Sequence, residues 1–210
     1  MRSRRALAAA LALGVLGSPG AAAAYEELPR ALAKATPDMF AQGVRVLDEP
    51  HEPYVQVSTR KAWSRGRRLQ GAHAEDVHLR AMVDRQSGAV RWQVWHELVM
   101  HDRPSEIIGV NYRVGGRTEQ GRLVRIDQWD DCPGVDAIQR ACNRHARVVF
   151  ELPGSVVEEI AAAYRANSRE PWRLRFSERG GGTVTGGLAP AEVAGLRDAV
   201  EHVRRGLQAG

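Results

Sequence analysis

The sequence is poor in cysteine, with only Cys132 and Cys142 among its 210 residues. Two cysteines alone make a weak metal site, and a redox pair would need Cys-x-x-Cys spacing, so neither role is expected. In an oxidising compartment, two cysteines that lie ten positions apart most often form a disulfide with each other. We therefore predict a Cys132–Cys142 disulfide, which would stabilise the fold by roughly 2–3 kcal/mol.

Long hydrophobic runs are missing after residue 24, where no segment approaches the roughly 18 apolar residues of a membrane span. Before it, Arg2, Arg4 and Arg5 precede an apolar run over 6–16 and the small residues 22–24. This order is typical of a secretory signal peptide, and the charges at one end disfavour an ordinary alanine-rich helix. We predict a signal peptide over 1–24 cleaved near Ala24, one globular domain over 25–210, no transmembrane segment and a periplasmic or extracellular location.

A strong excess of one charge is also missing. The chain has 30 Lys and Arg against 25 Asp and Glu, and removing the three leader arginines leaves 27 against 25. The local basic cluster of Lys61, Arg65, Arg67 and Arg68 fits a solvated loop, or contact with anionic lipid or polysaccharide. No nucleic-acid recognition motif accompanies it, so we expect no nucleic-acid partner.

Catalytic motifs are the third absence. No Gly-x-Ser-x-Gly elbow occurs, and His96 and His101 are five apart where the zinc protease motif needs four. A denser cluster, His73, Glu75, Asp76 and His78, would split two and two between the faces of a strand, leaving each side short of a zinc site. We expect no catalytic residue, no metal and no cofactor, and the sequence leaves open whether a distant ligand completes that cluster.

What the sequence does contain is a long antiparallel hairpin over 76–101. Apolar residues recur at alternate positions in both arms, and pairing Asp84 with Ala89 across a four-residue loop aligns them. The predicted register sets Val83 opposite Val90, Ala81 opposite Trp92 and Leu79 opposite Val94. A slip of one residue would bring the apolar row against Arg91 and Gln93, so this register is strongly preferred.

Other segments complete the expected architecture. Further strands are predicted at 54–59, 107–114, 123–129, 146–152, 172–176 and 183–185, and helices at 25–35, 37–43, 155–164 and 190–207. The turn at 115–117 is expected to join 107–114 to 123–129, and Ser155 with Glu158 forms a predicted capping box. Consecutive strands with short links favour an antiparallel sheet of about six to eight strands, with helices at the N-terminus, near 155–166 and at the C-terminus. The class is α+β, with a β-sandwich carrying peripheral helices as the alternative.

Tryptophans give the best pocket hypothesis. Trp92, Trp129 and Trp172 fall in or at the end of predicted strands, where core packing is the normal role. Trp95 instead lies on the mixed face of the hairpin, and aromatic side chains dominate ligand pockets. We therefore predict a ligand groove on that face formed by four residues: Trp95, His78, Arg80 and Gln93.

The order of these features resembles a group of exported bacterial proteins of unknown function. The resemblance rests on five features: Val77-His-Leu-Arg-Ala81, the 84–88 turn, the cysteine pair, the 148–153 strand and Leu188-Ala-Pro-Ala-Glu-Val-Ala-Gly-Leu196. It covers about two thirds of the chain after the leader. It implies a periplasmic location and supplies no activity, substrate or catalytic residue.

Three functional hypotheses follow. The first is a non-catalytic cell-envelope protein whose partner is another protein, the wall or a membrane surface. The second is a module that binds a small apolar molecule or a glycan beside Trp95. The third is a metal-dependent hydrolase, which the missing motifs make the weakest of the three.

Overall fold

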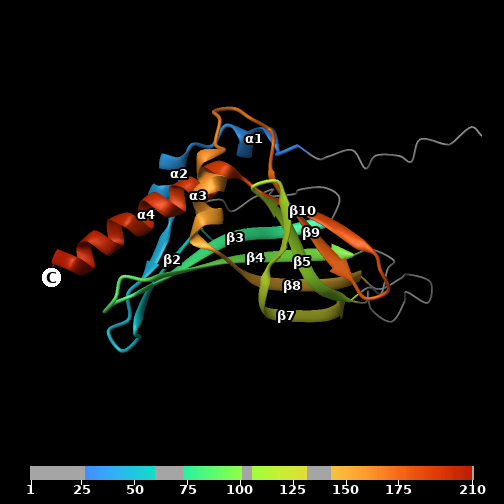
Figure 1. Ribbon diagram of the computed structural model, residues 1–210, viewed down its shortest axis with the longest axis horizontal. Helices are drawn as coiled ribbons and strands as arrows, with labels where there is room; N and C mark the ends of the chain where they lie inside the picture. Colours follow the sequence, from blue (N-terminus) through green and yellow to red (C-terminus); the bar gives the residue numbers. More distant parts are fainter. Residues whose placement is uncertain (1–26, 60–72, 101–105, 132–142, 210) are drawn as a thin grey trace, which may run out of the picture.

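The computed structural model describes residues 27–59, 73–100, 106–131 and 143–209. Within these ranges the chain forms four helices and ten strands, and the strands divide between two antiparallel sheets (Figure 1). The expected α+β class is therefore confirmed, although the strands make two sheets where one was predicted. None of the helices in the described ranges combines the length and the apolar character that a membrane crossing requires.

The larger sheet is built around the predicted hairpin. Its six strands, in spatial order, are β1 (Arg45–Leu47), β2 (Tyr54–Ser58), β3 (His73–Asp84), β4 (Val90–Met100), β8 (Asn143–Leu152) and β7 (Arg122–Asp131). The pairing of β3 with β4 sets Val83 opposite Val90, Ala81 opposite Trp92 and Leu79 opposite Val94. The predicted register is confirmed, because only this alignment buries the apolar rows of both arms on one face.

The smaller sheet has four strands. In spatial order they are β10 (Thr183–Leu188), β9 (Trp172–Glu178), β5 (Ile107–Val114) and β6 (Arg117–Gln120). The turn after β5 leads into β6, so the expectation that 107–114 pairs with 123–129 is wrong, and the latter residues belong to β7 in the other sheet. The chain changes sheets at Gly121, whose N–H donates to the Val110 carbonyl at 2.8 Å. A Cβ on Gly121 would lie 2.7 Å from Val110 Cγ1, so no side chain fits at this crossing.

The two sheets share one core. The ring of Phe176 on β9 packs edge-on against Phe150 on β8 at 6.4 Å and against His96 on β4 at 4.9 Å. All three side chains are fully buried. A Cβ on Gly186 of β10 would lie 2.7 Å from His96 Nε2, so glycine allows the edge of the small sheet to close over this histidine.

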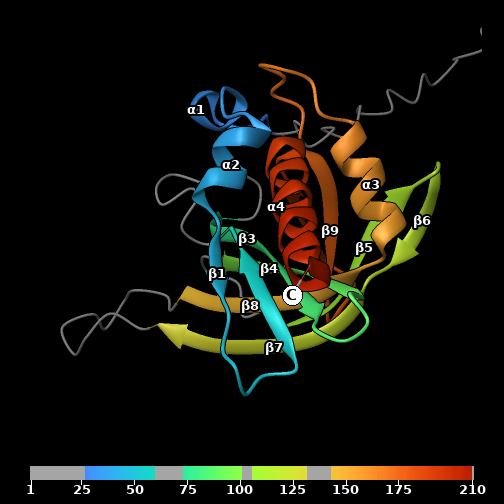
Figure 2. The ribbon, with the colours of Figure 1, turned by 90° about the vertical axis from the view of Figure 1, so that its left-hand side faces the viewer.

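Four helices cover the remaining apolar surface: α1 (Arg30–Ala33), α2 (Pro37–Gly43), α3 (Gly154–Ala162) and α4 (Pro190–Ala209). The longest, α4, runs between α2 and α3 (Figure 2) and buries Val193, Leu196 and Val200. Thr36 caps α2 as predicted, since its hydroxyl accepts a hydrogen bond from the Met39 N–H.

The start of α3 differs from the prediction. The expected capping box is not formed, because the helix begins at Gly154 and Pro153 occupies the N-cap position. The Pro153 carbonyl accepts from the N–H groups of Val156 and Val157, which places Ser155 inside the first turn. Since proline has no side-chain acceptor, the first N–H groups of α3 receive no side-chain cap.

A buried polar contact joins α4 to the large sheet. The hydroxyl of Thr59 accepts from the Leu79 N–H at 2.9 Å and donates to Glu192 Oε1 at 2.5 Å. Thr59 is fully buried and Glu192 is 2% exposed. Glu192 lies in the first turn of α4, where the helix dipole favours a carboxylate.

Several predictions fall outside the described residues. These are the signal peptide over 1–24, the basic cluster over 61–68, His101 and the Cys132–Cys142 disulfide. They stay predictions.

Candidate functional site

A groove opens where one end of the large sheet meets the small sheet. Its volume is about 360 Å³, within the range of roughly 300–1,000 Å³ typical of small-molecule sites. We call it the intersheet groove and define it by its lining: Val90, Arg91, Trp92, Tyr112, Glu119, Gln120, Arg122, Glu151, Leu152, Pro153 and Gly154. These residues come from β4, β5, β6, β7, β8 and the start of α3, so no single stretch of sequence encodes the groove.

Two buried aromatic side chains bring polar atoms to the intersheet groove. Trp92 is 9% exposed and Tyr112 is 4% exposed. Within the described ranges, neither the Trp92 indole nor the Tyr112 hydroxyl has a hydrogen-bond partner. Although most of each ring is buried, neither polar atom is among the fully buried ones, so both groups are open to solvent and available to an occupant of the groove.

The uncapped end of α3 reaches the same space. Trp92 Nε1 lies 3.8 Å from the position that a Cβ on Gly154 would occupy. The first turn of α3 contains no acidic side chain, so nothing there compensates the positive end of the helix dipole. The indole N–H and the first N–H groups of the helix together make a cluster of hydrogen-bond donors.

Charged side chains surround the opening. Arg91 is exposed, and Arg122 forms an ion pair with Glu151 at 3.3 Å. Burial, and then the neighbouring Glu119 carboxylate, raise the pKa of Tyr112 above its usual value. Tyr112 therefore keeps its proton at neutral pH and can donate a hydrogen bond there.

The lining combines apolar, aromatic and charged side chains. It contains no histidine, cysteine, serine, threonine or lysine, and its titratable side chains are those of Tyr112, Glu119, Glu151, Arg91 and Arg122. No group of three or more potential metal ligands was found among the described residues. The arrangement can hold an oxyanion at the donor cluster while Leu152 and Val90 contact an apolar part of the same molecule.

The predicted site residues lie elsewhere, on the face of the large sheet turned away from the core. His78 pairs with Trp95 and Arg80 pairs with Gln93 across β3 and β4. The rings of His78 and Trp95 stack at 5.6 Å, and the Arg80 guanidinium lies 4.2 Å from the indole centroid. The structure thus brings the four predicted residues together. The side chains of His78 and Arg80 contact the Trp95 indole. Ligand binding beside Trp95 stays a prediction.

Two other sequence expectations can be compared with the structure. Trp129 on β7 is 41% exposed and stacks on His145 at 5.1 Å, so the prediction that it packs in the core is wrong. Of the histidine and acidic cluster at the start of β3, only the His78 side chain is described. A register shift between Ala74 and Asp76 interrupts the strict alternation on which the two-and-two split depended.

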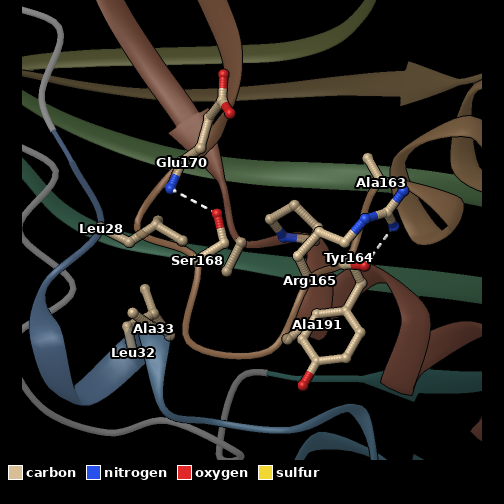
Figure 3. A pocket seen from close by; sticks show the side chains of 11 residues that line it. Leu28, Leu32, Ala33, Ala163, Tyr164, Arg165, Ser168, Glu170 and Ala191 are labelled. Atoms are coloured by element: carbon tan, nitrogen blue, oxygen red, sulfur yellow. Dashed lines mark hydrogen bonds between the residues drawn. The ribbon is translucent and has the colours of Figure 1, made fainter.

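A second cavity lies under the N-terminal helices (Figure 3). Leu28, Leu32 and Ala33 line it on one side and Tyr164 and Ala191 on the other, with Ser168 between them. Its volume of about 20 Å³ is enough for one water molecule and too small for a ligand.

The sequence reasoning missed the intersheet groove for two reasons. Trp92 was assigned to the core from its alternation, which is correct for its ring but says nothing about its N–H. Pro153-Gly154 was interpreted only as a strand stop. A proline at an N-cap, followed by a helix without early acidic residues, is the signal in the sequence that indicates exposed backbone donors.

Comparisons of the chain with protein-family models, with curated proteins and with solved structures found no match.

Proposed function

We propose that this protein is a non-catalytic binding protein whose intersheet groove takes a small organic carboxylate. The observation that carries the proposal is that the Trp92 N–H, which has no partner among the described residues, lies beside the uncapped start of α3. A carboxylate bound there would accept hydrogen bonds from the indole and the backbone, and charge-assisted bonds of this kind are about twice as strong as neutral ones.

The composition of the lining supports an anion with an apolar body. Arg91 and Arg122 line the groove together with Glu119 and Glu151, and Val90, Trp92 and Leu152 supply apolar surface. A neutral ligand of the same shape would leave the helix end without a compensating charge.

The indole N–H of Trp92 offers a direct reporter. We would record ¹H–¹⁵N spectra of the protein with a panel of small carboxylic acids, hippurate among them, each paired with its neutral primary amide. The expected result is that one or more acids shift the Trp92 indole resonance while the matched amides do not. The resonance is assigned by its loss in Trp92→Phe, which keeps an apolar ring and removes the donor.

The variant also supplies the energetic test. A hydrogen bond to a charged group is worth about 1.5–3 kcal/mol, so Trp92→Phe should weaken acid binding roughly ten- to a hundredfold. The control is Trp129→Phe, which makes the same chemical change at an exposed position on β7 and should leave affinity unchanged. The proposal fails if no acid shifts the resonance, if amides shift it equally, or if both variants weaken binding alike.

We also propose that the protein acts after export, in the periplasm or outside the cell. This rests on the pattern of residues 1–24 and on the predicted cysteine pair, and it agrees with a binding role in the cell envelope.

A further inference from the structure

The small sheet presents an arginine-rich face to the outside. Its strands place Arg113 on β5 beside Arg173 and Arg175 on β9. Arg175 lies opposite both Asn111 and Thr185, and Arg113 lies opposite Thr118. We define the arginine face by six residues: Asn111, Arg113, Thr118, Arg173, Arg175 and Thr185.

The described part of this face holds no carboxylate. The acidic residues of the same sheet, Glu119 and Glu178, lie opposite Tyr112 and Ile107, which are both buried on the core side. Arg175 is exposed and forms no ion pair with the described residues. Arg113 is exposed and donates only to the neutral Gly116 carbonyl at 3.1 Å. Two guanidinium groups on adjacent strands therefore have no carboxylate partner within the described part of the chain.

The arginine face is also hollowed, with a volume of about 200 Å³. Hydroxyl and amide groups from Thr118, Thr185 and Asn111 line it beside the guanidinium groups. Its apolar lining residues, Tyr112 and Leu174, are 4% and 2% exposed, so the surface offered to a partner is polar. Guanidinium groups bind carboxylates bidentately, and hydroxyl and amide groups suit the hydroxyls of a sugar.

We propose that the arginine face binds an acidic polysaccharide, with Arg113 and Arg175 holding sugar carboxylates. Single-stranded nucleic acid is a poorer fit, because the hollow presents no exposed aromatic ring on which a base would stack. An anionic membrane is also a poorer fit, because no exposed apolar side chain lines the hollow to enter a bilayer. Tyr112 lines both hollows, but Arg113 and Arg175 do not line the intersheet groove, so this proposal is independent of the function proposed there.

The test uses a size-defined oligogalacturonate as the probe, with isothermal titration calorimetry on the folded full chain at two salt concentrations. A maltooligosaccharide of equal length is the neutral control. We expect the acidic oligomer to bind, the neutral one not to bind, and affinity to fall as salt rises. The double variant Arg113→Gln/Arg175→Gln should weaken binding by roughly tenfold or more.

The matched control is Arg117→Gln/Arg205→Gln. It removes the same charge from two exposed arginines, one opposite Val114 on the core side of the sheet and one on α4. Equal loss in both double variants would show nonspecific attraction and overturn the proposal, as would a wild-type chain that does not bind the probe. Vesicles with phosphatidylglycerol, bound more tightly than the oligomer through the same arginines, would also overturn it in favour of a membrane. Trp92→Phe should leave oligogalacturonate binding unchanged, which keeps this test separate from the groove.

Discussion

Replacing Thr59 with valine should destabilise the fold, because the change removes two buried hydrogen bonds while keeping the shape of the side chain. The bond to the Glu192 carboxylate is worth about 1.5–3 kcal/mol, and the Leu79 N–H left without its acceptor costs about 1–3 kcal/mol. The two losses share one hydroxyl and are not fully additive, so we expect a drop of about 3 kcal/mol in the free energy of unfolding.

Thr59→Ser is the matched control. Serine keeps the hydroxyl and removes one buried methyl group, which should cost about 1 kcal/mol. Urea unfolding followed by tryptophan fluorescence measures both variants. With a denaturant slope of about 2 kcal/mol/M, the midpoint should fall by about 1.5 M for Thr59→Val and about 0.5 M for Thr59→Ser.

The reasoning would be refuted if Thr59→Val unfolded within about 0.5 kcal/mol of the wild type. It would equally be refuted if serine and valine destabilised the fold alike, because the hydroxyl would then contribute no more than the methyl group. An unchanged slope is required for either comparison, since a changed slope reports a different unfolded or native state.

Two further predictions concern the hairpin loop and the residues outside the described ranges. Hydrogen bonds from the Ser87 N–H and hydroxyl, and then from the Gln86 N–H, lower the pKa of Asp84. The contribution of this loop to stability is therefore present above the ordinary aspartate pKa and is lost as pH falls through the lowered folded value. A ¹³C carboxyl titration of the folded chain should give a midpoint below that of the unfolded chain, and equal midpoints would contradict this. Intact mass spectrometry of protein isolated from its own envelope should show cleavage near Ala24 and joined Cys132 and Cys142 thiols; an uncleaved chain or two free thiols would contradict those predictions.

Local sequence patterns were sufficient for the elements whose stability is local or whose register has one solution. The 3.6-residue period of α4 and the Thr36-Pro37 start of α2 each specify a helix from nearby residues alone. The β3–β4 hairpin could be aligned because its loop is short and a one-residue slip would expose every apolar side chain. These elements are confirmed with small changes at their ends.

The second sheet could not be predicted in the same way. Residues 107–114 alternate clearly, but alternation does not say which strand is the neighbour. The strand that follows β6 is directed into the other sheet at Gly121, where the absence of a Cβ lets the chain pass close to Val110. Exposure of Trp129 follows from the same crossing, since it places β7 at the outer edge of the large sheet.

The sequence by itself determined the α+β class, the central hairpin with its register and the amphipathic C-terminal helix, because each depends on periodicity over a few neighbouring residues. Only the tertiary structure decided that Trp92, Tyr112 and the start of α3 surround one groove, and that Arg113 and Arg175 share a face on which the described residues place no carboxylate. Both sites bring together strands distant in sequence, and a pairing between distant strands depends on the packing of the whole core.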